Sequence, residues 1–186
     1  MARGLRIVGG SAGGRRLVAP TGDARPTTDR VKEALFNVLA SRIAGITFAD
    51  LYAGTGAVGI EALSRGASKV LFVEQSHAAV RVIRENLREL GIGTRAEVLH
   101  GRATAMLSKV QADIVFLDPP YRLEREYESI LTLLGEKPPA LVIAQHAPHL
   151  KLQENYGILR RTRVLTHGDN ALSFYGQSED GARPSD

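Results

Sequence analysis

The stretch that decides the fold is Ile46-Thr47-Phe48-Ala49-Asp50-Leu51-Tyr52-Ala53-Gly54-Thr55-Gly56-Ala57-Val58-Gly59-Ile60-Glu61-Ala62-Leu63. Its first six residues are mostly apolar and predict a buried strand, and its last residues predict a helix. The glycines between them allow a tight turn and let a ligand approach the backbone closely. Such a strand, glycine loop and helix in succession are typical of the first unit of an α/β nucleotide-binding sheet.

The residues that follow alternate between strand and helix patterns. Strands are expected at 69–74, 96–100, 112–117 and 140–145, and helices at 77–90, 103–110 and 123–134. A further helix is expected at 28–42, and two β-rich runs, 157–166 and 171–176, are joined by turn residues. This order predicts a doubly wound, Rossmann-like, mostly parallel seven-stranded sheet with a C-terminal antiparallel hairpin.

A second unusual stretch, Asp118-Pro119-Pro120-Tyr121, follows the apolar run 112–117. Each proline fixes φ and lacks an N–H group, so the loop is stiff and its carbonyl oxygens are free to accept hydrogen bonds. Asp118 adds a carboxylate and Tyr121 a flat ring. Because parallel strands end at the same edge of a sheet, we expect this loop beside the glycine loop, where it can hold a planar group that carries an amine.

The glycine loop matches the G-x-G-x-x-G pattern, and Glu74 lies 20 residues after Gly54, where an acid can bind two ribose hydroxyls. Any cofactor that contains adenosine can use these two features. Asp50, four residues before Gly54, favours S-adenosylmethionine over a nicotinamide dinucleotide, because an acid there can face the amino-acid half of the cofactor. The chain also has no separate substrate domain of the kind a dehydrogenase needs, although a dehydrogenase stays as an alternative.

The composition narrows the class of protein. The chain has 186 residues, 44% of them hydrophobic, and no cysteine, which excludes disulfide partners, thiolate–metal sites and a cysteine nucleophile. Its five histidines are scattered, so no metal site is expected. No apolar run approaches the length of a membrane span and no signal peptide is visible, so we expect a cytoplasmic protein without membrane contact.

Positive charge is concentrated at the N-terminus. Residues 1–32 carry seven Arg or Lys against two Asp, whereas the rest of the chain sums to −1. Paired apolar residues on either side of the glycines at 9–14 predict a short β-hairpin. We therefore expect a basic hairpin extension at 1–24 that contacts nucleic-acid phosphates, a main domain at 25–177 and a disordered tail at 178–186.

Together these motifs resemble the RsmD family, class I S-adenosylmethionine-dependent methyltransferases that modify guanine N2 in bacterial 16S rRNA. The resemblance covers roughly residues 3–176. It is carried by Arg6-Ile7-Val8-Gly9-Gly10, Gly14-Arg15, the segment from Arg25-Pro26-Thr27-Thr28 to Asn37, Asp50-Leu51-Tyr52-Ala53-Gly54-Thr55-Gly56, Glu61-Ala62-Leu63-Ser64-Arg65-Gly66-Ala67, Glu74 and Asp118-Pro119-Pro120-Tyr121.

The resemblance also implies roles for individual residues. Those implied in binding S-adenosylmethionine are Asp50, Tyr52, Gly54, Gly56, Glu74, Gln75, Arg102, Ala103 and Asp118. Those implied in catalysis are Asp118, Pro119 and Tyr121, and those implied in binding RNA are Arg3, Arg6, Arg15, Arg16, Arg25, Thr27 and Arg30. An arginine at 102 cannot accept a hydrogen bond from the adenine amino group, so that contact is expected from the Ala103 backbone or is absent.

The loop at Asp118 does not by itself select one substrate. The same arrangement serves N6-adenine or N4-cytosine methylation of DNA or RNA, and only the resemblance points to 16S rRNA, on a small (30S) ribosomal subunit that is assembled or partly assembled. Methylation of protein glutamine uses a related loop that usually begins with Asn, which Asp118 disfavours. A ribosome-assembly factor without catalysis is the alternative from another class.

Overall fold

A computed structural model describes residues 5–19, 27–120 and 123–177 of the chain. Three residues predicted to be functional, Arg3, Arg25 and Tyr121, lie outside these ranges, as does the predicted tail at 178–186. The described residues contain no helix long and apolar enough to cross a membrane.

One eight-stranded sheet forms the centre of the molecule, with the strand order β3-β2-β1-β4-β5-β8-β7-β6. The first five strands in this order are parallel, and β8, β7 and β6 continue the sheet in antiparallel pairing. The strands are β1 (Thr47–Leu51), β2 (Lys69–Glu74), β3 (Ala96–His100), β4 (Ile114–Leu117), β5 (Leu141–His146), β6 (Asn155–Tyr156), β7 (Leu159–His167) and β8 (Asn170–Gln177). The predicted fold class is confirmed. The predicted count of seven strands is wrong, because β6 has only two residues and is too short to show a periodic pattern.

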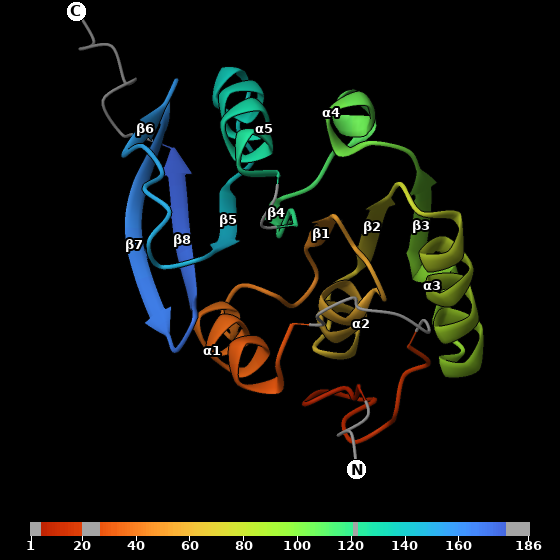
Figure 1. Ribbon diagram of the computed structural model, residues 1–186. Helices are drawn as coiled ribbons and strands as arrows, with labels where there is room; N and C mark the ends of the chain where they lie inside the picture. The colour runs from red at the N-terminus through yellow and green to blue at the C-terminus, as the bar shows by residue number, and fades with distance from the viewer. Residues whose placement is uncertain (1–4, 20–26, 121–122, 178–186) are drawn as a thin grey trace, which may run out of the picture.

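Helices cover both faces of the sheet (Figure 1). One face carries α1 (Asp29–Leu39), α2 (Ala57–Ser64) and α3 (His77–Leu90), and the other carries α4 (Ala103–Met106) and α5 (Glu124–Glu136). Two 3₁₀ turns among the described residues are η1 (Gly93–Arg95) and η2 (Leu107–Lys109), and η2 takes up part of the helix predicted at 103–110. The hydroxyl of Thr28 caps α1 by accepting from the Val31 N–H at 3.4 Å, and threonine is among the residues preferred at this position.

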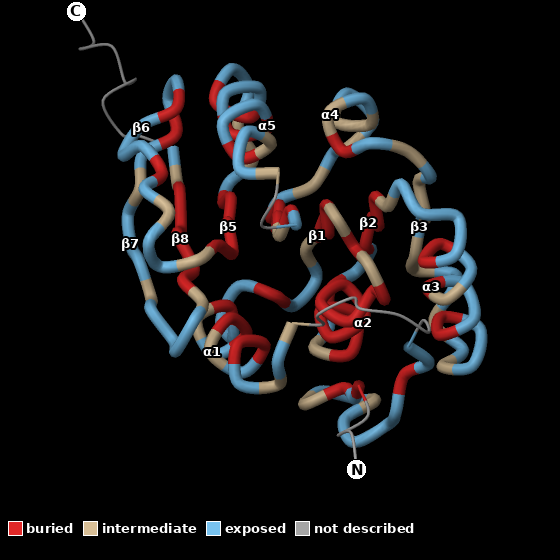
Figure 2. Tube along the Cα trace, viewed as in Figure 1, coloured by how far each residue is buried: buried red, intermediate tan, exposed pale blue. Residues whose placement is uncertain are grey.

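The two faces bury separate hydrophobic clusters, and α2 is the most enclosed helix (Figure 2). All eight residues of α2 are buried, including Glu61. Gly59 allows this close approach to the sheet, because a Cβ there would lie 2.3 Å from Phe72 Cε1. The helix that follows the glycine loop is therefore held rigidly against β1 and β2.

The N-terminal hairpin is present and packs on α2. Arg6 pairs with Arg16 in an antiparallel bridge, and the side chains of Leu5, Ile7 and Leu17 are buried in the cluster of α1, α2 and α3. The glycine-rich turn lies against the end of α2: a Cβ at Gly10 would lie 2.1 Å from the Ser64 carbonyl oxygen.

A buried carboxylate fixes the hairpin to α2. The Glu61 side chain accepts hydrogen bonds from the backbone N–H groups of Val8 and Gly9, each at 2.7 Å. It also accepts from Arg65 Nε at 2.8 Å and lies 4.0 Å from Lys32 Nζ, which is itself fully buried. Glu61 was part of the family motif, but its sequence position gave no sign of this contact with residues more than 50 positions away.

Candidate active site

The chain reverses its direction of winding between β1 and β4. From β1 it proceeds outward to β2 and β3, and then crosses to β4 and β5 on the other side of β1. In open α/β sheets, ligands bind at such a switch point, outside the carboxyl ends of the strands. The sequence places the glycine loop after β1, Glu74 at the end of β2 and Asp118 directly after β4, so all three meet at this edge.

Glu74 braces the glycine loop from the neighbouring strand. Its carboxylate accepts from the Gly54 N–H at 2.8 Å and from the Ser76 N–H at 2.7 Å. Since a carboxylate has about four lone-pair positions, it keeps capacity for two further donors such as ribose hydroxyls. Gly54 and Gly56 have φ of 54° and 78°. A Cβ at Gly54 would meet only the Tyr52 carbonyl oxygen, at 4.0 Å, so the backbone there faces open space.

Asp50 lies beneath the glycine loop. Its side chain is 2% exposed and accepts from the Gly59 N–H, in the first turn of α2, at 2.9 Å. Burial raises the pKa of Asp50 to about 7; the Gly59 bond lowers it in part, and the negative charges of Asp118 and Glu74 raise it further. Asp50 is therefore acted on by the charges of both Asp118 and Glu74, and a cation bound near it would relieve this repulsion.

Asp118 is held at the site by the segment that begins α1. Thr27 Oγ1 donates to Asp118 Oδ2 at 3.5 Å, which joins two motifs that lie 91 positions apart. Burial raises the pKa of Asp118 to about 7, and the Thr27 bond lowers it in part. Pro119 is buried and Pro120 exposed, and the Pro120 carbonyl accepts from the Leu123 N–H at 2.7 Å, which turns the loop into α5.

Glu126 of α5 joins two predicted cofactor residues, and the sequence analysis did not find it. Tyr52 has a positive φ of 67°, and its hydroxyl donates to Glu126 Oε2 at 2.6 Å. Burial, and next this bond, raise the pKa of Tyr52. Arg102, the residue before α4, donates from Nη2 to Glu126 Oε1 at 3.1 Å. The Arg102 guanidinium thus has a carboxylate partner in the protein, while Ala103 begins α4 as a buried residue.

Gln75 follows Glu74 and is exposed. Its carbonyl oxygen lies 3.1 Å from His100 Nε2, and the His100 ring stacks on His77 with 3.8 Å between ring centroids. Within the described ranges, no group of three or more His, Asp or Glu residues is arranged to hold a metal ion.

The predicted RNA-binding residues are spread over the hairpin and α1. Arg6 Nε binds Asp29 at 2.8 Å, and Arg15 Nη2 donates to the Glu89 carbonyl near the end of α3 at 2.8 Å. Arg16 and Arg30 are exposed, whereas Thr27 is half-buried beside Asp118. Arg6 and Arg15 thus bind groups within the protein, and Thr27 belongs to the candidate active site itself.

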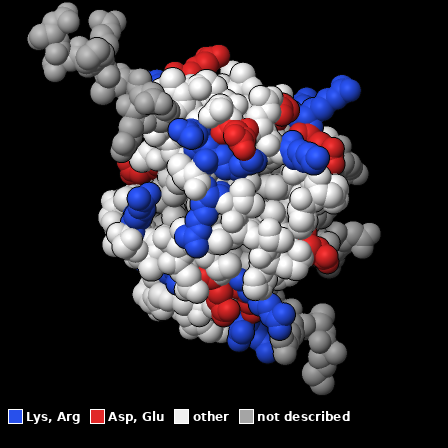
Figure 3. Space-filling model, turned by 90° about the vertical axis from the view of Figure 1, so that its left-hand side faces the viewer, with Lys and Arg blue, Asp and Glu red and all other residues white. Residues whose placement is uncertain are grey.

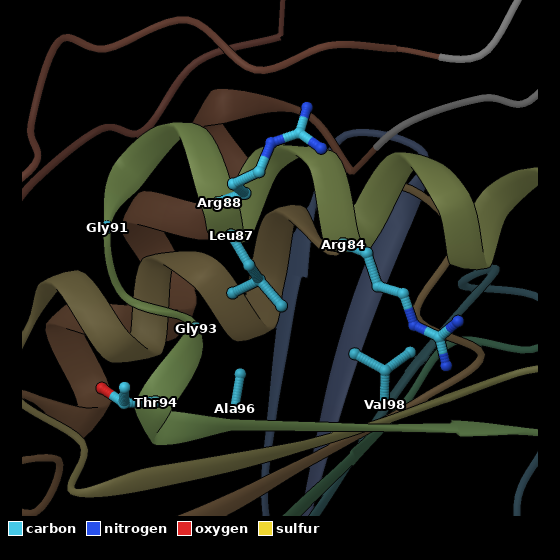
Figure 4. Close-up of a pocket in the computed structure, with 8 residues that line it drawn as sticks. All are labelled: Arg84, Leu87, Arg88, Gly91, Gly93, Thr94, Ala96 and Val98. Atoms are coloured by element: carbon cyan, nitrogen blue, oxygen red, sulfur yellow. The ribbon is translucent and has the colours of Figure 1, made fainter.

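A separate open pocket of about 570 Å³ lies between α3 and the edge strand β3 (Figure 4). Leu87, Ala96 and Val98 face one another across it, while the Arg88 side chain extends away from β3. None of the predicted cofactor residues lines this pocket. The candidate site at the switch point is therefore separate from this pocket.

The raised pKa of Asp118 predicts a pH-dependent cost in stability. A carboxyl group whose folded pKa lies above its unfolded value stabilises the fold below about pH 4, and this contribution is lost as the pH rises through about 7. Asp118→Asn removes the ionisation. The measured quantity is the free energy of unfolding of Asp118→Asn minus that of the wild type, without cofactor. We expect this difference to be about 1–3 kcal/mol larger at pH 8 than at pH 5. Urea unfolding at the two pH values measures this difference, and an equal difference at both would contradict the raised pKa.

Comparison with known proteins agrees with this geometry. The family described as "Conserved hypothetical protein 95" matches residues 5–176. "Putative rRNA methyltransferase YlbH" of Bacillus subtilis is 36% identical, over 92% of this chain and 98% of its own. "Ribosomal RNA small subunit methyltransferase D" of Haemophilus influenzae is 37% identical, over 84% of this chain and 86% of its own. The solved structure of "Putative methyltransferase yhhF" of Escherichia coli has 33% identity and a TM-score of 0.81, and the match covers 94% of this chain and 98% of that one.

The sheet order and the loops at its carboxyl edge define a class I, Rossmann-like methyltransferase fold. Within that class, the chain belongs to the RsmD family of methyltransferases. The predicted family is therefore confirmed.

Proposed function

We propose that this protein transfers the methyl group of S-adenosylmethionine to the exocyclic N2 amine of a guanine in the 16S rRNA of the small ribosomal subunit. One observation carries the proposal. The glycine loop, which is bound by Glu74, and the Asp118 loop, which is bound by Thr27, lie at the same switch point of the sheet. The relatives named as rRNA methyltransferases support RNA as the substrate.

The charges of the site suit a cationic methyl donor. The negative charges of Glu74 and Asp118 act on Asp50, and Asp50 and Asp118 each have a pKa of about 7 because they are buried. A sulfonium and an ammonium group placed among them would favour the ionised carboxylates. When bound, S-adenosylmethionine supplies an electrophilic methyl group. Glu74 and the Gly54 backbone are suited to its ribose, and the Glu126 carboxylate binds both Tyr52 and Arg102 beside them.

The Asp118 loop prepares the amine. The lone pair of guanine N2 is delocalised into the ring, so the amine is a weak nucleophile. The Asp118 carboxylate and the Pro119 carbonyl accept its two hydrogens and direct the lone pair at the methyl carbon. The new C–N bond forms as the C–S bond breaks, sulfur keeps the electron pair, and the surplus proton leaves nitrogen beside Asp118. Orientation of this kind contributes up to about 7–11 kcal/mol in ideal systems, and Asp118 stabilises the charge that develops on nitrogen.

The proposal is tested with 30S subunits, 70S ribosomes and naked 16S rRNA from a bacterial strain that lacks this methyl group. With labelled S-adenosylmethionine, we expect methylation of one guanine at N2 on small-subunit particles and much slower reaction on naked RNA. Mapping the modified nucleotide decides the base. A methylated adenine or cytosine would contradict the guanine assignment, and equal rates on naked RNA would contradict the need for a folded ribonucleoprotein.

A further inference from the structure

The outer edge of β7 carries a second basic surface, which is separate from the N-terminal hairpin. Residues 147–167 contain Lys151, Arg160, Arg161 and Arg163 but one acidic residue, Glu154. β6 pairs with β7 only at Leu159 and Arg160. From Arg161 to His167, the described residues provide no strand on the outer side of β7, and Lys and Arg side chains gather along this edge (Figure 3).

A β-bulge puts two of these arginines on one face. Residues three apart in a regular strand face opposite sides. In β7 the register shifts between Arg161 and Arg163, so that Arg160 pairs with Gly176 and Arg163 with Phe174. Gly176 and Phe174 are two apart and share a face of β8, so Arg160 and Arg163 share the same face of β7. Bulges commonly re-aim side chains in this way.

Arg160 and Arg163 are also available to a partner. Both are exposed, and neither has an ion-pair partner among the described residues. Arg161 differs, because it faces Leu152 and Glu154: its Nη1 donates to the Leu152 carbonyl at 3.0 Å and its Nη2 lies 3.6 Å from Glu154. Arg161 is therefore bound within the protein, whereas Arg160 and Arg163, on the other face of the bulged strand, remain free to bind an anion.

The register places Arg163 nearer than Arg160 to the candidate active site. Arg160 is level with Ile114, at the start of β4, through Gly176 and Leu141. Arg163 pairs with Phe174 in β8, which pairs with Ile143 in β5. Ile143 pairs with Phe116 in β4, two residues before Asp118. Three strand spacings correspond to about 14 Å. β7 is also parallel to β5 and β4, so it ends at the same edge of the sheet as the Asp118 loop.

We propose that the bulged edge of β7, with Arg160 and Arg163, is a docking surface for the phosphate backbone of the RNA that carries the target base. The inference rests on the proposed function and adds a contact to it. Free guanidinium groups complement phosphates, which position a nucleic acid without reading its sequence. Arginines on an edge strand also discourage pairing with another protein strand, which favours RNA over a protein strand as the occupant. The RNA would then be contacted by β7 in addition to the hairpin.

The test is the double variant Arg160→Glu/Arg163→Glu, assayed on small-subunit particles at several salt concentrations. We expect KM for the particles to rise about 10-fold or more while kcat stays within about 3-fold, because phosphate contacts position the substrate. The slope of log KM against log salt should fall by about 1–2. Arg160→Lys/Arg163→Lys keeps the charge and should stay close to the wild type.

The matched control is Arg42→Glu/Lys109→Glu, which makes the same change in charge. Both residues are exposed and precede the amino ends of β1 and β4, at the opposite edge of the sheet. This control should leave KM and the salt slope unchanged, and all variants should keep the wild-type affinity for S-adenosylmethionine. If the wild type methylates the particles but the Glu variant matches it in KM and slope, the inference is wrong. A rise in KM with an unchanged slope, or an equal loss in the Lys variant, would also overturn it. If the wild type methylates no rRNA particle, the proposed function itself fails.

Discussion

Replacing Asp118 by alanine is expected to lower kcat for methyl transfer by at least about 10²–10³-fold. The carboxylate is the one charged acceptor at the end of β4, and Thr27 Oγ1 holds it at 3.5 Å. Alanine leaves the Pro119 carbonyl as the only acceptor that we propose for the two amine hydrogens, and it removes the charge that stabilises the developing cation. Single-turnover assays on small-subunit particles measure kcat, and calorimetry measures the affinity for S-adenosylmethionine, which should stay within a few fold.

Asp113→Ala is the matched control for this prediction. Asp113 lies before the same strand at its opposite end, where its Oδ2 accepts from the Thr47 N–H at 2.8 Å. This variant should keep its turnover within about 3-fold, because Asp113 lies far from the reacting atoms. Near-normal turnover in Asp118→Ala would show that the loop has been assigned the wrong role. An equal loss in both variants would point to damage in β4 rather than to chemistry.

The parts of the fold that the sequence predicted are those determined by neighbours in the chain. The apolar run 46–51 and the glycines after it describe one local turn, and the structure contains that turn with Gly54 and Gly56 at positive φ. The strands β2, β4 and β5 each contain four consecutive apolar residues (70–73, 114–117 and 141–144), because helices cover both faces of the sheet. The mostly parallel, doubly wound arrangement followed from β–α alternation.

The contacts that the sequence did not predict join residues far apart in the chain. Glu126 stands in the polar first turn of α5, where an acidic residue needs no special explanation, yet it binds Tyr52 and Arg102. The bulge in β7 leaves no trace in an alternating pattern, because it shifts the register by a single residue. Such features depend on which elements become neighbours, and that follows only from the complete packing.

The N-terminal hairpin shows how a correct element can have a partly different role. Its charge suggested a contact to nucleic-acid phosphates, and Arg16 remains exposed for such a contact. Its apolar side chains, however, are buried with α1 and α2, and its glycines approach the Ser64 backbone. A hairpin fixed in this way presents its arginines in a defined position. That reduces the entropy cost of ordering them when RNA binds.

Glu61→Ala is therefore expected to destabilise the protein as a whole, by about 3–5 kcal/mol. The change leaves the Val8 and Gly9 N–H groups without their acceptor and removes a negative charge 4.0 Å from Lys32 Nζ, where both side chains are fully buried. Lys32 retains only Asp29, at 3.4 Å, as an ion-pair partner among the described residues. Urea unfolding measures the loss, and faster trypsin cleavage after Arg15 or Arg16 would show that the hairpin has detached from α2.

The control for Glu61→Ala is a variant that removes one partner of an exposed ion pair, in which the charged atoms lie closer together. Glu97 binds Lys69 at 2.6 Å, but their side chains are 45% and 49% exposed, so Glu97→Ala should cost only about 0–1 kcal/mol. Glu61→Gln keeps one acceptor oxygen and the side-chain volume, and should fall between the two alanine variants. If Glu61→Ala costs no more than Glu97→Ala, the carboxylate does not anchor the hairpin. In that case the burial of Leu5, Ile7 and Leu17, each stabilising by about 1.5–3 kcal/mol, must hold it in place.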